Sequence, residues 1–349
     1  MASHPYEDLP AQAFWSRGVA QADPLAPDAI YQRKWALDPD WKIATAGSCF
    51  AQHVARYMRE RNFNVIDTEP APGGLADERR KAYGYELYSA RYGNIYTTRQ
   101  LLQLLREAHG QHTPEAAIWA KNGRYFDALR PGVEPEGLES EAEVRAHRAH
   151  HLACVREMVA QMDMFVFTLG LTEAWEHTDS GTVFPAAPGT LVGTFDAAQF
   201  RFVNFSHSEV MADLVEALAL IDALRGKETP VLLTVSPVPL TATAGGRHIL
   251  LSSTYSKAVL RAVAGELADR NDMIDYFPSY EIITNPAAKS RFYAENLRSV
   301  LPEGVATAMA AFFGEQVSGS AVTQKEAEAE PEDEDELHCE EAMLEAFAK

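Results

Sequence analysis

Short apolar segments alternate with segments of helical periodicity through most of this 349-residue chain. Such alternation is typical of a parallel sheet whose strands are connected by helices packed on its faces. We therefore expect an α/β fold, a three-layer α/β/α sandwich built on a five-stranded parallel sheet. The predicted strands cover 42–46, 64–67, 164–169, 230–235 and 273–277, and the predicted helices cover 50–61, 98–108, 143–162, 208–224, 256–270 and 304–313.

The pattern also suggests how the chain is divided. Residues 1–40 precede the first strand and are expected to pack on the body as an N-terminal extension. One α/β domain is predicted over 41–314, with a turn-rich insertion at 68–142 that we expect to cover one end of the sheet. Residues 315–349 form an acidic tail.

The tail carries much of the charge. The chain has a formal net charge of −19, and eleven acidic residues against two lysines give residues 325–349 a net charge of −9. Such a run predicts a solvated, disordered linker. Beyond it, 339–347 places Met343, Leu344 and Phe347 on one face of a short helix, which predicts docking to the body or to a protein partner. A frayed terminal turn is the alternative.

Composition excludes several classes of protein. The body has no continuous basic stripe, which argues against nucleic-acid binding. No apolar run approaches the roughly 18 residues that a membrane-spanning helix needs. The first residues lack the pattern of a secretory signal, so we expect a cytoplasmic protein. Cys49, Cys154 and Cys339 are too few for a disulfide framework, and no Cys/His spacing predicts a metal site.

A turn that suits nucleophilic chemistry follows the first strand. Gly47-Ser48-Cys49-Phe50-Ala51 joins a buried strand to a helix. A cysteine there lies at the carboxyl edge of the sheet, and the helix N-terminus stabilises its thiolate. The alternative is that Cys49 is a small core residue, as free cysteines often are.

This motif resembles the one that names the GSCFA family, a branch of the SGNH/GDSL hydrolase and acyltransferase group. The resemblance spans about Pro5 to Phe313 and implies an SGNH-hydrolase, flavodoxin-like sandwich. Its further signatures are Tyr92-Gly93-Asn94-Ile95-Tyr96, the segments 167–175 and 234–240, Tyr255-Ser256-Lys257 and the segment 275–281.

The resemblance implies roles for single residues. Laid over the Gly-Asp-Ser-Leu turn of the wider group, Cys49 matches the nucleophilic serine, and Ser48 is the rival nucleophile. The oxyanion donors would be the N–H groups of Cys49, Gly93 and Gly170, with Asn94 in the second motif. Thr172 stands where the group has an asparagine whose side chain donates to the oxyanion. The resemblance therefore does not settle whether this chain has that donor.

The general base is the weakest part of the resemblance. Relatives place an Asp-x-x-His pair before the last helix, and here the matching segment is Asn296-Leu297-Arg298-Ser299. We expect a histidine from elsewhere, His248 in the loop after the fourth strand or His53 one helical turn after Cys49. Glu173 would orient that base or bind substrate, or it is a structural carboxylate.

Together these features predict an SGNH-like esterase or O-acyltransferase that acts on an acylated carbohydrate or transfers an acyl group to one. No cofactor is expected, apart from coenzyme A or another acyl carrier as the donor of a transferase. Trp119, Trp175 and Tyr125 could stack on a sugar ring or belong to the core. One rival hypothesis is a non-catalytic binding protein with the same fold, and a second is an adaptor whose tail recruits the partner.

Overall fold

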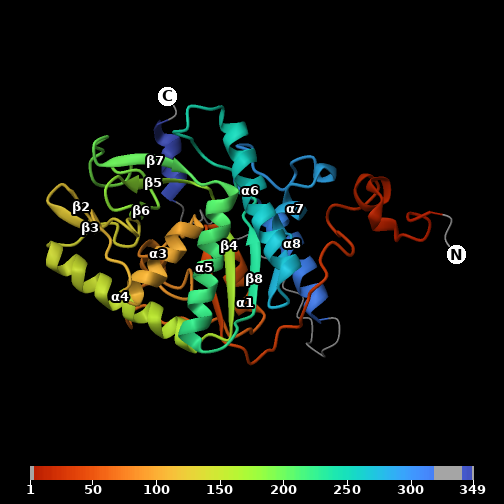
Figure 1. Ribbon diagram of the computed structural model, residues 1–349, viewed down its shortest axis with the longest axis horizontal. Coiled ribbons are helices and arrows are strands. Elements are labelled where there is room, and N and C mark those ends of the chain that lie inside the picture. The colour runs from red at the N-terminus through yellow and green to blue at the C-terminus, as the bar shows by residue number, and fades with distance from the viewer. Residues whose placement is uncertain (1–3, 318–339, 348–349) are drawn as a thin grey trace. The chain divides into compact units, whose positions relative to one another are not determined.

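The computed structural model describes residues 4–317 and 340–347 and divides them into two compact units. The larger unit contains 38–276, and the smaller unit contains 4–37 together with 277–317. Figure 1 shows the helices and strands of both units. The acidic run at 326–336, predicted to be a disordered linker, lies outside the described residues, as does Cys339.

A four-stranded parallel sheet forms the centre of the larger unit. Its strands are β1 (Ile43–Gly47), β4 (Met164–Leu169), β8 (Val231–Val235) and β9 (Ile274–Phe277), in the order β1-β4-β8-β9. Every residue of the first three strands is buried, as expected for a sheet covered by helices. Figure 1 shows β4 and β8 side by side, and their register pairs Phe165 with Val231. The parallel α/β sheet is therefore confirmed.

The predicted fifth strand at 64–67 is wrong. Only Val65 pairs with the sheet, through a single parallel bridge to Ile43. The chain leaves the edge of β1 directly afterwards, because the amide of Thr68 donates to Ser89 instead and Asp67 accepts from the amide of Glu69. These local bonds replace the ladder that a fifth strand would need.

The helices that flank the sheet form close to where the sequence places them. Ser140 caps α4 through the amide of Glu143, and Ser206 begins α5 with a capping box. The exception is α6, which begins seven residues early because the side chain of His248 accepts from the amide of Leu250. The bounds are α1 Phe50–Glu60, α4 Glu141–Gln161, α5 His207–Arg225 and α6 Ile249–Arg270.

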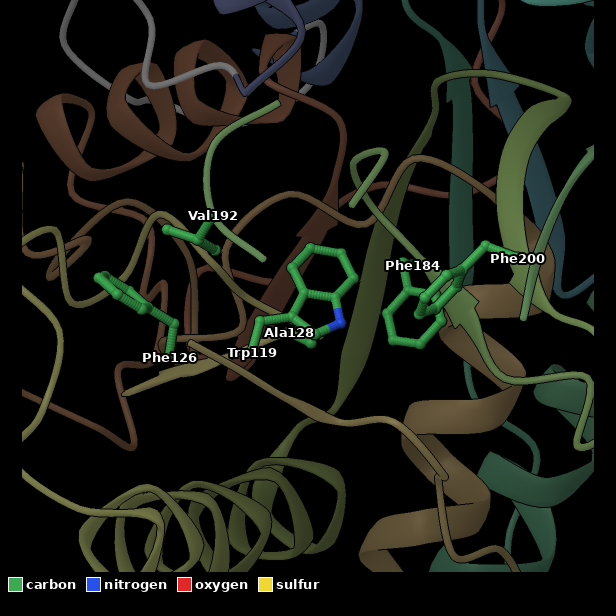
Figure 2. Close-up of a cluster of buried hydrophobic side chains, with 6 residues drawn as sticks. All are labelled: Trp119, Phe126, Ala128, Phe184, Val192 and Phe200. Atoms are coloured by element: carbon green, nitrogen blue, oxygen red, sulfur yellow. The ribbon is translucent and has the colours of Figure 1, made fainter. Parts of the chain in front are cut away.

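Two smaller sheets were not predicted. The insertion contains α2 (Asp77–Ala82), α3 (Thr98–Ala108) and the hairpin of β2 (Ile118–Lys121) and β3 (Arg124–Asp127). After β4 the chain forms an antiparallel sheet in the order β6-β5-β7, with β5 at Glu173–His177, β6 at Val183–Phe184 and β7 at Phe200–Asn204. Trp119 joins the hairpin to this sheet by packing against Phe184 and Phe200, as Figure 2 shows. It is a core residue.

The smaller unit has its own core. Tyr31, from the N-terminal segment, stacks on Phe312 of α8 (Pro302–Val317) and meets the ring of Phe277 edge-on. Arg33 also donates to the backbone carbonyl of Gln316. This unit further contains α7 (Ser279–Ile283) and the short helices η1 (Ala11–Ala13), η2 (Ser16–Ala20) and η3 (Pro286–Ala288).

Near the C-terminus, η4 (Glu340–Phe347) is a 3-10 helix in which Phe347 is exposed. Among the described helices, none combines the length and the apolar character needed to cross a membrane.

Candidate active site

The turn between β1 and α1 is built around Gly47. Its φ is +135°, and a Cβ at this position would lie 2.4 Å from the carbonyl oxygen of Thr168 in the neighbouring strand. Only glycine fits that backbone and that approach. The amide of Ser48 then donates to the same carbonyl at 3.1 Å, which fixes the turn to the end of β4.

Ser48 and Cys49 follow in the turn and are both buried, with exposed fractions of 2% and 3%. The Cβ of Ser48 lies only 2.8 Å from the place where a side chain on Gly170 would begin. Its hydroxyl has no hydrogen-bond partner among the described residues. Cys49 is already in the helical conformation, with φ −51°, and directly precedes α1. The structure therefore brings the predicted nucleophile, its rival and Gly170 together.

The Gly93-Asn94 motif lies beside this turn. The amide of Ile95 donates to the carbonyl of Gly47 at 2.9 Å. The phenol of Tyr88 donates to the carbonyl oxygens of Ser48 and of the Asn94 side chain. Because Gln52 also donates to that Asn94 oxygen at 3.4 Å, the amide group of Asn94 is held in one orientation. The side-chain oxygen of Asn94 is thus engaged by both Tyr88 and Gln52.

The amide of Gly170 is not available as predicted. It donates to the carbonyl of Tyr96 at 3.2 Å, and the amide of Leu171 donates to the same oxygen at 2.9 Å. This pair of bonds ties the loop after β4 to the Gly93-Asn94 segment. In this conformation the N–H of Gly170 has a structural role. It could donate to an oxyanion, as predicted, only if its hydrogen bond to Tyr96 broke.

Helix α6 contributes two buried residues to the same loop. The hydroxyl of Ser256 accepts from the amide of Thr172 at 3.0 Å, and the ammonium of Lys257 donates to the carbonyl of Gly170 at 2.8 Å. Lys257 is only 3% exposed. Sequence reasoning gave these residues no role, although a lysine among the apolar residues of a helix was a signal, since lysine is seldom buried without function or partner. They hold Gly170 against Ser48.

Glu173 and Thr172 begin the small sheet. The hydroxyl of Thr172 donates to the side chain of Asn204 at 2.7 Å. The carboxyl of Glu173 is buried and accepts from the hydroxyl of Thr243 at 2.9 Å. Burial raises the pKa of Glu173 above its ordinary value, against the lowering effect of hydrogen bonds from Thr243 and Ser252. This carboxyl is therefore more easily protonated than one in water.

The two candidate bases lie in different settings. His248 is exposed, and its Nδ1 accepts from the amide of Leu250, so it serves α6 as a cap. His53 is half-buried on α1, with its ring 5.6 Å from that of Phe50 and its Nδ1 3.4 Å from Arg56. Its position four residues after Cys49 puts both on one helix face, with Cβ atoms about 5–6 Å apart. The geometry therefore favours His53, and the role of base stays a prediction for both.

The segment that departs from the relatives' Asp-x-x-His pattern lies in the smaller unit. Its backbone closes on itself, because the side chain of Asn296 accepts from the amides of Arg298 and Ser299 at 2.9 Å. Leu297 takes a left-handed φ of +52° at the tip. An asparagine-stabilised turn thus stands where relatives have the acid/base pair, as the sequence indicates.

A buried ionic cluster joins the insertion to α4. His151 and Glu69 are joined through Nδ1 and a carboxylate oxygen at 2.6 Å, and Arg130 bridges Glu69 to Asp127. Burial raises the pKa of Glu69, but the hydrogen bond and charge of His151 and the charge of Arg130 outweigh it and bring the pKa to about 2. Burial and the charge of Arg130 lower the pKa of His151 to about 4. We therefore assign a neutral His151 and an ionised Glu69 at neutral pH.

This assignment makes stability depend on pH. Below its ordinary pKa of 6.5, His151 takes up a proton in the unfolded chain but not in the folded one until about pH 4. Stability present at neutral pH is therefore lost as the pH falls through that window, on the order of 3 kcal/mol. His151→Gln should flatten the decline, measured by urea unfolding between about pH 7 and about pH 4.5. Equal slopes for both proteins would contradict the assignment.

A small cavity lies between the Gly93-Asn94 motif and this ionic cluster. Its volume is about 30 Å³, which holds a water molecule and not a substrate. The residues around it include Asn94, Gln100, Glu107, His112 and Arg148. A substrate does not fit in this cavity.

Cys154, unlike the predicted nucleophile Cys49, has an unreactive thiol. It is buried on α4, and burial raises its pKa to about 11, with further raising by the charge of Glu69. Such a thiol is inert at neutral pH. His150 lies 3.6 Å from its sulfur.

Comparison with known proteins gives one match. The model of the GSCFA family matches residues 42–312, which include the turn, the Gly93-Asn94 motif and the α6 residues described above. No curated protein and no solved structure matches the chain.

Proposed function

Because this chain belongs to the GSCFA family, whose name-giving motif forms the turn between β1 and α1, we propose that it is a cysteine-dependent esterase or O-acyltransferase of the SGNH type. Its substrate in this proposal is an acylated carbohydrate or a carbohydrate acceptor. The observation that carries the proposal is the convergence of two further segments on the Gly47-Ser48-Cys49 turn: the Gly93-Asn94 motif reaches Gly47, and the loop after β4 reaches Ser48.

The turn favours a thiolate in two ways. Cys49 lies at the N-terminus of α1, where the helix dipole stabilises negative charge. The buried ammonium of Lys257 adds positive charge on the far side of Gly170, the residue that touches Ser48. Both effects act in a buried setting, where water screens charge weakly.

The reaction would then run in two steps. The sulfur of Cys49 attacks the carbonyl carbon of an ester, the bond from that carbon to the alcohol oxygen breaks, and the proton of the thiol passes through a histidine to the leaving alcohol. Water or a sugar hydroxyl next attacks the thioester and releases Cys49. The N–H groups of Cys49 and Gly93 and the side-chain NH₂ of Asn94 are the proposed oxyanion donors.

Two observations favour the non-catalytic alternative. Cys49 is only 3% exposed, and the asparagine-stabilised turn at 296–299 lacks the relatives' acid/base pair. A binding protein that retains the fold needs neither an open nucleophile nor a base. Catalysis, by contrast, requires the residues that bury Cys49 to move aside when substrate enters.

Reactivity of the thiol separates the two alternatives. In a Cys154→Ala, Cys339→Ser background, Cys49 is the one cysteine left. We expect iodoacetamide to label it in the native protein with a pH midpoint at least about one unit below the ordinary thiol pKa of about 8.5. A midpoint at or above that value, or no labelling of the native protein, would favour the binding protein.

The described cysteines also agree with the expected location. Cys49 and Cys154 are free thiols, as is usual for proteins of a reducing compartment. We propose that the protein acts in the cytoplasm.

A further inference from the structure

One face of the small antiparallel sheet carries a row of side chains that the proposed reaction does not use. Residues two apart on a strand share a face, and directly opposite residues of paired strands do as well. The register pairs Glu173 with Asn204 and Trp175 with Phe202, so these four share one face. We propose that this face binds the neutral sugar ring of the substrate, an inference that rests on the proposed function.

The aromatic part of the face is held rigidly and is partly exposed to solvent. The half-buried ring of Trp175 meets Phe202 at 6.0 Å and Phe195 at 5.2 Å, both edge-on. Phe195 is 45% exposed. The opposite neighbour of Trp175 is Phe184, a member of the buried cluster in Figure 2. A tryptophan fixed in this way offers a preorganised flat surface for the apolar face of a pyranose ring.

The polar part of the face has one acceptor and one donor. The carboxyl of Glu173 accepts from the hydroxyl of Thr243, which shows that it binds hydroxyl groups. The side-chain oxygen of the exposed Asn204 accepts from Thr172, which leaves the NH₂ group of Asn204 as the donor. Because opposite residues have Cβ atoms about 4.5–5.5 Å apart, the two groups suit neighbouring hydroxyls of one ring.

The loop after β8 borders the same face. A Cβ on Gly245 would lie 3.3 Å from the ring of Phe202, so the loop backbone approaches the aromatic ring closely. Thr243, two residues earlier, is the hydroxyl that bonds Glu173. The face is therefore continuous from Phe195 to Thr243.

The chemistry selects the ligand class. An apolar chain would leave the buried carboxyl of Glu173 without a further hydroxyl partner, and an anionic ligand would be repelled by it. A neutral sugar supplies both an apolar ring face and hydroxyl donors.

The sugar-binding face lies close in sequence to the nucleophilic turn. It begins at Glu173, three residues after Gly170, and Gly170 touches Ser48 in that turn.

The test is direct binding to the full-length protein. A panel of neutral oligosaccharides (cellohexaose, xylohexaose, maltohexaose and chitohexaose) is titrated by calorimetry against the wild type, Trp175→Ala and Phe195→Ala. We expect at least one sugar to bind, and Trp175→Ala to bind it at least about tenfold more weakly. Phe195→Ala, a change in an exposed loop residue, should weaken binding too and covers the case in which Trp175→Ala does not fold.

Two controls separate this inference from the proposed function. Trp15→Ala removes a tryptophan that is 69% exposed in the smaller unit and should leave binding unchanged. Cys49→Ala should bind the sugar as the wild type does, because the nucleophile is not part of the face. Sugar binding without ester turnover would refute the enzyme alone. If no panel member binds, or if Trp175→Ala and Phe195→Ala bind as the wild type does, the sugar-binding face is refuted.

Discussion

Replacing Cys49 by alanine should abolish the turnover of short-chain acyl esters, with a loss on the order of 10³-fold or more. Alanine fills nearly the same volume, and the position is buried beside a turn that Gly47 and Thr168 hold through backbone bonds. The fold should therefore persist, and the lost activity reports chemistry. Release of p-nitrophenol from its acetate ester, together with urea unfolding of the same samples, measures both properties.

Cys154→Ala is the matched control for this change. Cys154 is also buried in the larger unit, but burial raises the pKa of its thiol to about 11, so it should not react. We expect this variant to retain turnover. If Ser48→Ala abolished turnover while Cys49→Ala retained it, the nucleophile would be Ser48, whose buried hydroxyl has no hydrogen-bond partner among the described residues.

Gly47→Ala should have the largest effect on stability. The added Cβ would lie 2.4 Å from the carbonyl oxygen and 2.7 Å from the amide nitrogen of Thr168, both backbone atoms of β4. To relieve the clash, β1 must move away from β4, its one neighbour in the four-stranded sheet, and alanine must also adopt a φ of +135°. We expect a loss of about 4 kcal/mol or more, or failure to fold, by urea unfolding.

Gly74→Ala isolates the part of this loss that comes from the backbone angle. Gly74 also has a positive φ, +85°, but an added Cβ there would have no atom within 4 Å. Its replacement should cost about 1 kcal/mol. Equal stabilities of the two variants would show that contact with Thr168 does not decide the cost at Gly47.

The central sheet could be predicted because its strands are continuous apolar runs. The prediction for β4 coincides with the observed bounds, those for β8 and β9 begin one residue early, and that for β1 is shifted by one residue at both ends. The small sheet was missed because β5, Glu-Ala-Trp-Glu-His, mixes charged and aromatic residues without the period of two that marks a strand. Its strands are set by pairing with β7 and by the core around Trp119.

The candidate site was predicted in part. The strand, glycine and helix around Cys49 are local features, so the sequence sufficed to place the turn. The contacts of Gly170 with Ser48 and of Lys257 with Gly170 join residues far apart in the chain, and no single-sequence pattern encodes them. The burial of Cys49 and the capping role of His248 depend in the same way on segments that fold over or around them.

The proposed function rests on an acyl group carried by Cys49, and trapping that intermediate tests it most directly. The native protein is mixed with p-nitrophenyl acetate, quenched in acid within the first turnovers, digested and measured by mass spectrometry. We predict one added acetyl group on the peptide that contains Cys49, bound as a thioester that hydroxylamine removes and absent from Cys49→Ala. An unmodified Cys49 peptide during ester turnover, or an acetyl group on Ser48 instead, would contradict the proposal.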